Sequence, residues 1–172
     1  MGAVPAARHL GAGMTRATRH EPDPSETSAR PDPSGLRGKR ILYVEDDPSV
    51  RWATNDLLRE AGAICLLAAS HDQAVTLAAA EPQLALAILD FQMPDGDVGQ
   101  LVKRLRAVRA GLPLIGTSGA DARNDFAARG VTRFLEKPWE LADLARIMEG
   151  ADPYLQHVAS LDPRAYPPSL RD

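Results

Sequence analysis

The chain has 172 residues, of which 44% are hydrophobic and 25% charged, a composition typical of one globular domain with short extensions. A formal net charge of −3 gives no basic field that would favour nucleic acid, a single cysteine excludes an internal disulfide, and no segment is apolar enough to span a membrane. Because the N-terminus also lacks the apolar stretch of a signal peptide, we expect a cytoplasmic protein without membrane insertion.

Both ends of the chain differ in composition from the middle. Residues 1–38 are rich in proline and charged residues and carry almost no large apolar side chains, so they cannot bury enough surface to offset the entropy cost of ordering. We expect them to form a disordered N-terminal extension. Residues 151–172 contain four further prolines and are expected to form a loose C-terminal tail. The folded domain is therefore predicted between residues 39 and 150.

Within that domain, short apolar runs alternate with segments whose apolar residues recur at helical spacing. The apolar runs predict strands at 41–44, 64–68, 84–90, 114–117 and 131–135. Helices are predicted from Pro48 to about Ala61, after Ser70, after Asp97, over about 121–129 and from about Glu140. Strict alternation of strand and helix implies an α/β fold, a doubly wound parallel sheet with right-handed crossovers and helices on both faces.

Helical spacing and local composition also predict which side chains are buried. His71, at the start of the second helix, is expected to be exposed, and Cys65 lies in an apolar run and is expected to be a core thiol. Val108 is expected to face inward at the end of the third helix. The predicted inner face of the first helix consists of Val50, Ala53, Leu57, Leu58 and Ala61.

Polar side chains follow four of the five predicted strands. Glu45 and Asp46 follow the first strand, Asp90 ends the third, Ser118 follows the fourth and Lys137 follows the fifth. The carboxyl ends of parallel strands lie at one edge of the sheet, which is where ligands bind in open α/β folds. Each group alone has an ordinary explanation, because an aspartate often terminates a strand and clustered acids often form a solvated turn.

The combination of these groups predicts phosphoryl chemistry. Three carboxylates that converge would not all stay ionised without a cation, and Mg²⁺ prefers carboxylate oxygens, waters and a phosphate. Lys137 supplies a positive charge for a phosphoryl oxygen, and Ser118 supplies a hydroxyl donor. These are the parts needed to transfer a phosphoryl group onto a carboxylate nucleophile, for which Asp90 is the candidate.

Four motifs resemble the receiver domain of two-component response regulators, of the stand-alone chemotaxis-regulator-like kind. They are the first strand with its acidic cluster (residues 41–48), the segment Leu89-Asp90-x-x-Met93-Pro94, the segment Thr117-Ser118-Gly119 and the segment Phe134-Leu135-x-Lys137-Pro138. The resemblance covers about residues 39–150 and implies a five-stranded flavodoxin-like sheet with strand order 2-1-3-4-5.

The resemblance also implies a role for each site residue. Asp90 would be the phosphoacceptor, and Mg²⁺ would be bound by Asp46, Asp90 and the main-chain carbonyl of Gln92, with Glu45 acting through water. Ser118 and Lys137 would bind the phosphoryl group, and Phe134 would occupy the aromatic switch position. The implied phosphodonor is a histidine kinase or phosphotransfer protein, and the implied output is a protein effector rather than nucleic acid.

The sequence departs from the family pattern at three places. Val98 stands where the family usually has glycine, the span from Ser118 to Lys137 is short, and Phe134 lacks the hydroxyl of the tyrosine often found there. We therefore expect a reshaped loop after the third strand, an altered fourth helix and a switch that acts by packing alone.

Other functions fit the residues less well. An aspartyl phosphohydrolase needs a second aspartate two residues after the nucleophile, where this chain has Gln92, so we expect a signalling domain and not an enzyme. A nucleotide-binding module would need a glycine-rich loop after the first strand, and a scaffold without phosphorylation would not need the intact acids and lysine. The roughly 20 residues after position 150 are too few for an output domain, so a single-domain regulator is expected.

Overall fold

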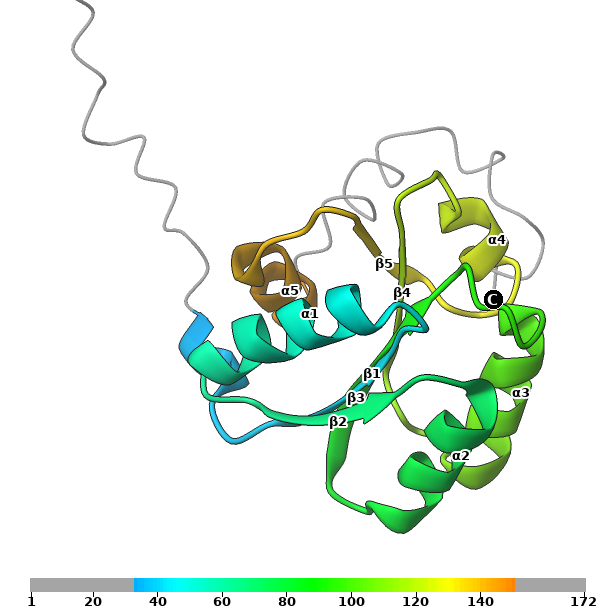
Figure 1. The fold of residues 1–172 in the computed structure, drawn as a ribbon, viewed down its shortest axis with the longest axis horizontal. Helices are drawn as coiled ribbons and strands as arrows, with labels where there is room; N and C mark the ends of the chain where they lie inside the picture. Colours follow the sequence, from blue (N-terminus) through cyan, green and yellow to red (C-terminus); the bar gives the residue numbers. More distant parts are fainter. Residues whose placement is uncertain (1–32, 151–172) are drawn as a thin grey trace, which may run out of the picture.

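Five parallel strands form the centre of the protein, whose computed structural model describes residues 33–150 (Figure 1). The strand order is β2-β1-β3-β4-β5, as predicted for a doubly wound, flavodoxin-like α/β fold. The strands are β1 Arg40–Val44, β2 Ile64–Ala68, β3 Leu84–Asp90, β4 Leu114–Ser118 and β5 Arg133–Glu136.

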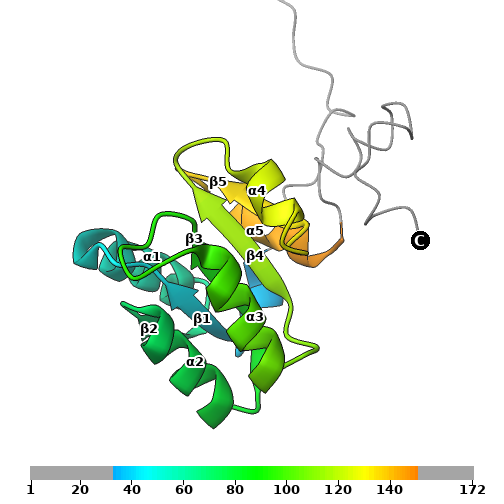
Figure 2. The same ribbon diagram turned by 90° about the vertical axis from the view of Figure 1, so that its right-hand side faces the viewer.

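The helices cover both faces of this sheet. Helices α1 and α5 lie on one face, and α2, α3 and α4 lie on the other (Figures 1 and 2). Each face has its own buried apolar cluster, so the middle strand β3 is covered on both sides and carries apolar residues at every position before Asp90. The helices are α1 Pro48–Glu60, α2 His71–Ala80, α3 Val98–Val108, α4 Arg123–Ala127 and α5 Leu141–Met148.

The N-terminal boundary of the fold lies earlier than predicted. Residues Pro33–Leu36 form a 3-10 turn, and the side chain of Leu36 is fully buried in the core beside α5. The expectation that disorder extends to residue 38 is therefore wrong for residues 33–38. The burial of Leu36 could not be predicted, because one leucine at the end of a polar segment has no periodic pattern around it. The rest of the expected extension, residues 1–32, and the expected tail, residues 151–172, lie outside the described residues.

The inner face of α1 also differs from the predicted one. Leu58 is fully buried as expected, but Val50 is 38% exposed and Ala53 is exposed as well. The inner side of the helix carries Asn55, which is buried, and Arg51, which is half-buried. Apolar spacing cannot detect polar residues that face inward, and Arg51 faces inward because it binds the loop that follows β1.

Three other burial predictions need correction. His71 is buried rather than exposed, because Asp95 of the β3–α3 loop accepts a hydrogen bond from its backbone N–H and lies 3.5 Å from its ring Nε2. Val108 is 40% exposed because it is the last residue of α3, beyond the turn that reaches the core. Cys65 is only half-buried, and burial raises the pKa of its thiol to about 11.

The segment between β4 and β5 contains the shortest described α-helix. Helix α4 has five residues, fewer than the span 121–129 predicted, and no side chain caps its N-terminus. It packs close to β4, since a Cβ atom at Gly116 would overlap the ring of Phe126. A glycine in the middle of a central strand is therefore required here by the close approach of an aromatic ring.

Candidate functional site

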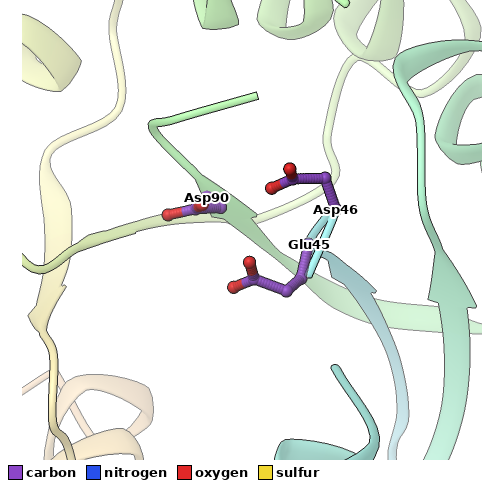
Figure 3. A group of neighbouring side chains, drawn as sticks. All are labelled: Glu45, Asp46 and Asp90. Carbon is purple, nitrogen blue, oxygen red and sulfur yellow. The ribbon is translucent and has the colours of Figure 1, made fainter. Parts of the chain in front are cut away.

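Three carboxylates meet at the carboxyl edge of the sheet. Glu45 and Asp46 follow β1, Asp90 ends the adjacent strand β3, and one oxygen of each lies within 4.8 Å of the others (Figure 3). Val44 pairs with Leu89 in the β1–β3 register, which brings the two strand ends to the same level. Glu45 and Asp90 are 2% and 4% exposed, whereas Asp46 is half-buried.

Lys137 joins this cluster from the end of β5. Its Nζ lies 2.6 Å from Glu45 Oε2 and 3.0 Å from Asp90 Oδ1, and its backbone N–H donates to the carbonyl of Ser118. Burial acts to lower the pKa of Lys137, but its hydrogen bonds to the two carboxylates outweigh burial, and the pKa is raised above its ordinary value. The lysine is therefore charged and offsets one of the three negative charges.

The carboxylate of Asp90 has an unfavourable environment for its own charge. Burial raises the pKa of Asp90 above its ordinary value, and the bond from Lys137 opposes this shift only in part. Glu45 adds to the rise because it carries a like charge nearby. A cation bound at this position would relieve that cost.

The donor set fits Mg²⁺. Among residues 33–150, Glu45, Asp46 and Asp90 are the group of acids close enough together to share a metal ion. Hard carboxylate oxygens are the ligands that Mg²⁺ prefers, and a divalent cation would offset the two negative charges that Lys137 leaves. Gln92 lies two residues after Asp90 in the loop that leaves β3, and its side chain is exposed.

The remaining predicted residues lie beside β4. Ser118 is fully buried at the end of that strand, and its Oγ accepts a hydrogen bond from the backbone N–H of Ala120 at 3.2 Å. Phe134 is 5% exposed and packs against Phe126, with ring centroids 5.9 Å apart. The Arg123 guanidinium lies 4.8 Å above the Phe134 ring and covers it from outside.

Two further residues hold the cluster and were not predicted. The hydroxyl of Tyr43, a fully buried residue of β1, donates to Glu45 Oε2 at 3.0 Å. Arg51 of α1 donates from Nη1 to the backbone carbonyls of Glu45 and Asp46, at 2.6 and 2.9 Å. A signal existed for Tyr43, because it precedes Glu45 by two residues on the same face of the strand.

The comparison with protein families identifies the family of this chain. The family model described as the response regulator receiver domain matches residues 41–149, which is most of the described chain. The protein belongs to the response regulator receiver domain family. The predicted family is confirmed, and phosphorylation of an aspartate and Mg²⁺ binding are general in that family.

Similar proteins place the receiver in different contexts. An uncharacterised 14.6 kDa protein of Leptolyngbya boryana is 31% identical over 115 residues, which is 63% of this chain and 86% of that protein. The DNA-binding transcriptional regulator NtrC of Proteus hauseri is 29% identical over 114 residues, 64% of this chain but only 24% of the regulator. The solved receiver domain of the hybrid histidine kinase CckA is 31% identical, with a TM-score of 0.54 over 65% of this chain and 97% of that one.

The chain thus spans about a quarter of the length of NtrC, so the activity of such larger relatives does not transfer to it. Within residues 33–150, no helix has the length and apolar character needed to cross a membrane.

Proposed function

We propose that Asp90 accepts a phosphoryl group from the phosphohistidine of a histidine kinase or phosphotransfer protein, and that the receiver passes the signal on through contacts with a downstream protein. The observation that carries this proposal is the position of Asp90, a buried carboxylate at a strand end, 3.0 Å from Lys137 Nζ and inside the acidic cluster. Membership of the receiver family supports the same chemistry.

Asp46, Asp90 and the main-chain carbonyl of Gln92 are the proposed Mg²⁺ ligands, with Glu45 acting through a water. Bound Mg²⁺ would neutralise charge on the attacking carboxylate and on the phosphoryl oxygens. Asp46 is the most accessible of the three acids, which suits a ligand that a metal ion meets first. Arg51 holds the backbone of Glu45 and Asp46 and so keeps both side chains at the edge of the sheet.

In the transfer step, one oxygen of Asp90 forms a bond to phosphorus while the bond between phosphorus and the imidazole nitrogen of the donor breaks. The imidazole leaves with the electron pair of that bond. Lys137 is already within hydrogen-bond distance of Asp90, so it needs only a short movement to pair with a phosphoryl oxygen. Burial excludes bulk water from the carboxylate before the donor docks.

Ser118 and Phe134 are the proposed readout. The hydroxyl of Ser118 accepts a bond from Ala120, which does not use its own proton, so it can donate that proton to a phosphoryl oxygen. Movement of Ser118 would change the packing of Phe134 against Phe126 and Arg123. Because Phe134 has no hydroxyl, the change is transmitted by packing alone.

A single-domain regulator in the cytoplasm, without direct contact to nucleic acid, is the setting that we propose. The match over 86% of the 14.6 kDa relative supports a receiver that works without an attached output domain. A cytoplasmic location accords with the phosphodonor, because phosphohistidine in kinases is formed from ATP.

The test is labelling of the full chain with a phosphorylated histidine kinase and, separately, with acetyl phosphate in the presence of Mg²⁺. We expect Asp90→Asn to keep the fold and abolish labelling, because the nucleophile is lost while the shape is kept. Asp56→Asn, which changes an exposed carboxylate on α1, is the matched control and should label normally. Labelling of the Asp90 variant at the wild-type rate would refute the assignment.

A further inference from the structure

Tyr43 lies directly beneath the acidic cluster. Its side chain is fully buried, and its hydroxyl donates to Glu45 Oε2 at 3.0 Å. The same oxygen accepts the bond from Lys137 Nζ at 2.6 Å. One oxygen of Glu45, a residue labelled in Figure 3, therefore accepts two hydrogen bonds, one from the neutral Tyr43 hydroxyl and one from the charged Lys137 ammonium group.

The surroundings of Glu45 make these donors necessary. The residue is only 2% exposed, so bulk water has little access to it, and a buried carboxylate that lacks hydrogen bonds is costly. Its other oxygen has one long bond, 3.4 Å from the backbone N–H of Asp47.

The proposed function removes one of the two short bonds. If Lys137 moves to a phosphoryl oxygen, Glu45 Oε2 loses its charged partner, and Tyr43 is then the side chain among the described residues that still donates to it. The benefit of the Tyr43 hydroxyl is therefore greater in the phosphorylated form than in the free form.

We infer that Tyr43 is a positioning residue that holds Glu45 in place when Lys137 leaves it for the phosphoryl group. This inference rests on the proposed function and adds a residue to it. Tyr43 touches neither the phosphoryl group nor the acceptor, and it acts through Glu45 alone. Tyr43 keeps the Glu45 carboxylate hydrogen-bonded after Lys137 has left it, which lowers the free-energy cost of moving Lys137. It therefore favours the phosphorylated form over the unphosphorylated form.

The experiment compares beryllofluoride binding, in the presence of Mg²⁺, to the full-length wild type and to Tyr43→Phe. Beryllofluoride is a stable mimic of the phosphoryl group, and its affinity can be measured by NMR titration. We expect Tyr43→Phe to weaken its binding about tenfold or more, the scale of one hydrogen bond to a charged group. Ile115→Val, which truncates a fully buried apolar residue in the same cluster, should lower thermal stability without changing this affinity.

A double-mutant cycle with Glu45→Gln separates positioning from general packing. If Tyr43 acts through the charge of Glu45, then Tyr43→Phe should have little further effect on affinity once Glu45 is neutral. A full tenfold loss in the Glu45→Gln background, or an equal loss in Ile115→Val, would overturn the inference. Unchanged affinity in Tyr43→Phe alone would overturn it as well.

Two outcomes distinguish this inference from the proposed function. If the wild type neither binds beryllofluoride nor accepts label, the proposed function fails first. If the wild type does both and only the Tyr43 comparison shows no effect, the inference alone fails. Should Tyr43→Phe not fold, the hydroxyl proton of Tyr43 in the wild type gives a second readout. This proton should stay protected from exchange with water after beryllofluoride binds. Loss of that protection on binding would contradict the proposed role.

Discussion

The acidic edge of the sheet and the region around α4 are built in different ways. The acidic edge consists of residues at the ends of β1, β3 and β5, and ion pairs and hydrogen bonds join them directly. The region around α4 has a five-residue helix without a side-chain cap, held by the packing of Phe126 between Phe91 and Phe134. The first region is fixed by charge on a rigid sheet, and the second by aromatic contacts on a short segment.

In the proposed function, this difference separates the site of chemistry from the site of readout. Phosphorylation needs its groups held at fixed distances, which strand ends in register provide. A readout needs a segment that can adopt two arrangements of similar free energy, and a short helix with few backbone hydrogen bonds is such a segment. We therefore expect substitutions at the acidic edge to affect stability through charge, and substitutions near α4 to affect it through volume.

The largest expected effect is that of Lys137→Met, which removes the positive charge from the acidic edge. Two buried carboxylates lose their charged partner, so the free energy of unfolding should fall by about 3 kcal/mol at neutral pH. Because the pKa of Lys137 is raised in the folded state, its contribution is fully present below its ordinary pKa and is lost only as the pH rises through the raised value. Urea denaturation at pH 7 measures the loss.

Lys103→Met on the exposed side of α3 is the matched control and should change stability by less than about 0.5 kcal/mol. An equal, small effect of both substitutions at pH 7 would show that Lys137 does not stabilise the cluster.

The next effect tests the aromatic side of the comparison. Gly116→Ala adds a Cβ atom that overlaps the Phe126 ring, so the ring must move, and the cost should be about 2 kcal/mol. Phosphorylation with acetyl phosphate should continue, because the nearest atoms to the added Cβ atom all belong to the Phe126 ring and to none of the three acids. Gly119→Ala, where a Cβ atom meets nothing within 4 Å, is the control. If both variants unfold at the same urea concentration, α4 is not held by this contact.

Much of this architecture was predictable from the sequence because it follows from repeated patterns. Alternating apolar runs and helical spacing predict the parallel sheet, and the polar residues at strand ends, Glu45, Asp90 and Lys137, were expected to meet because parallel strands share one carboxyl edge. The predicted strand from Leu84 to Asp90 agrees with β3 at both ends.

What could not be predicted depends on single contacts between distant segments. Leu36 is buried by α5, and His71 by the loop that carries Asp95, and neither residue is part of a periodic pattern. Arg51 was missed for a related reason, since a search for apolar faces passes over polar side chains that turn inward to bind the site. Tyr43 was part of the predicted strand 41–44, but its hydrogen bond to Glu45 was not predicted. The roles proposed for all the site residues remain predictions: Glu45, Asp46, Asp90, Gln92, Ser118, Phe134 and Lys137.

The smallest expected effect returns to the acidic edge, where function and stability should oppose each other. Burial raises the pKa of Asp90 in the folded state, so the folded protein binds this proton more tightly than the unfolded chain does. Stability from this group is therefore greatest below the ordinary pKa of an aspartate and falls as the pH rises toward the raised value. At pH 7 the full cost of burying the charged Asp90 carboxylate remains. The substitution Asp90→Asn removes this cost, while Lys137 keeps its bond to Glu45.

The metal-free Asp90→Asn variant should thus be more stable than the wild type at pH 7, because burial raises the pKa of the Asp90 carboxyl group and makes its charge costly. The advantage should shrink at acidic pH, below the raised pKa of Asp90, because the wild-type carboxyl group is then protonated and its burial no longer costs charge desolvation. Urea denaturation in EDTA at both pH values measures it, with Asp56→Asn as the control. A variant less stable than the wild type at pH 7 would mean that the bond between Asp90 and Lys137 outweighs the cost of burying the Asp90 charge. The charge of Asp90 would then stabilise the folded protein.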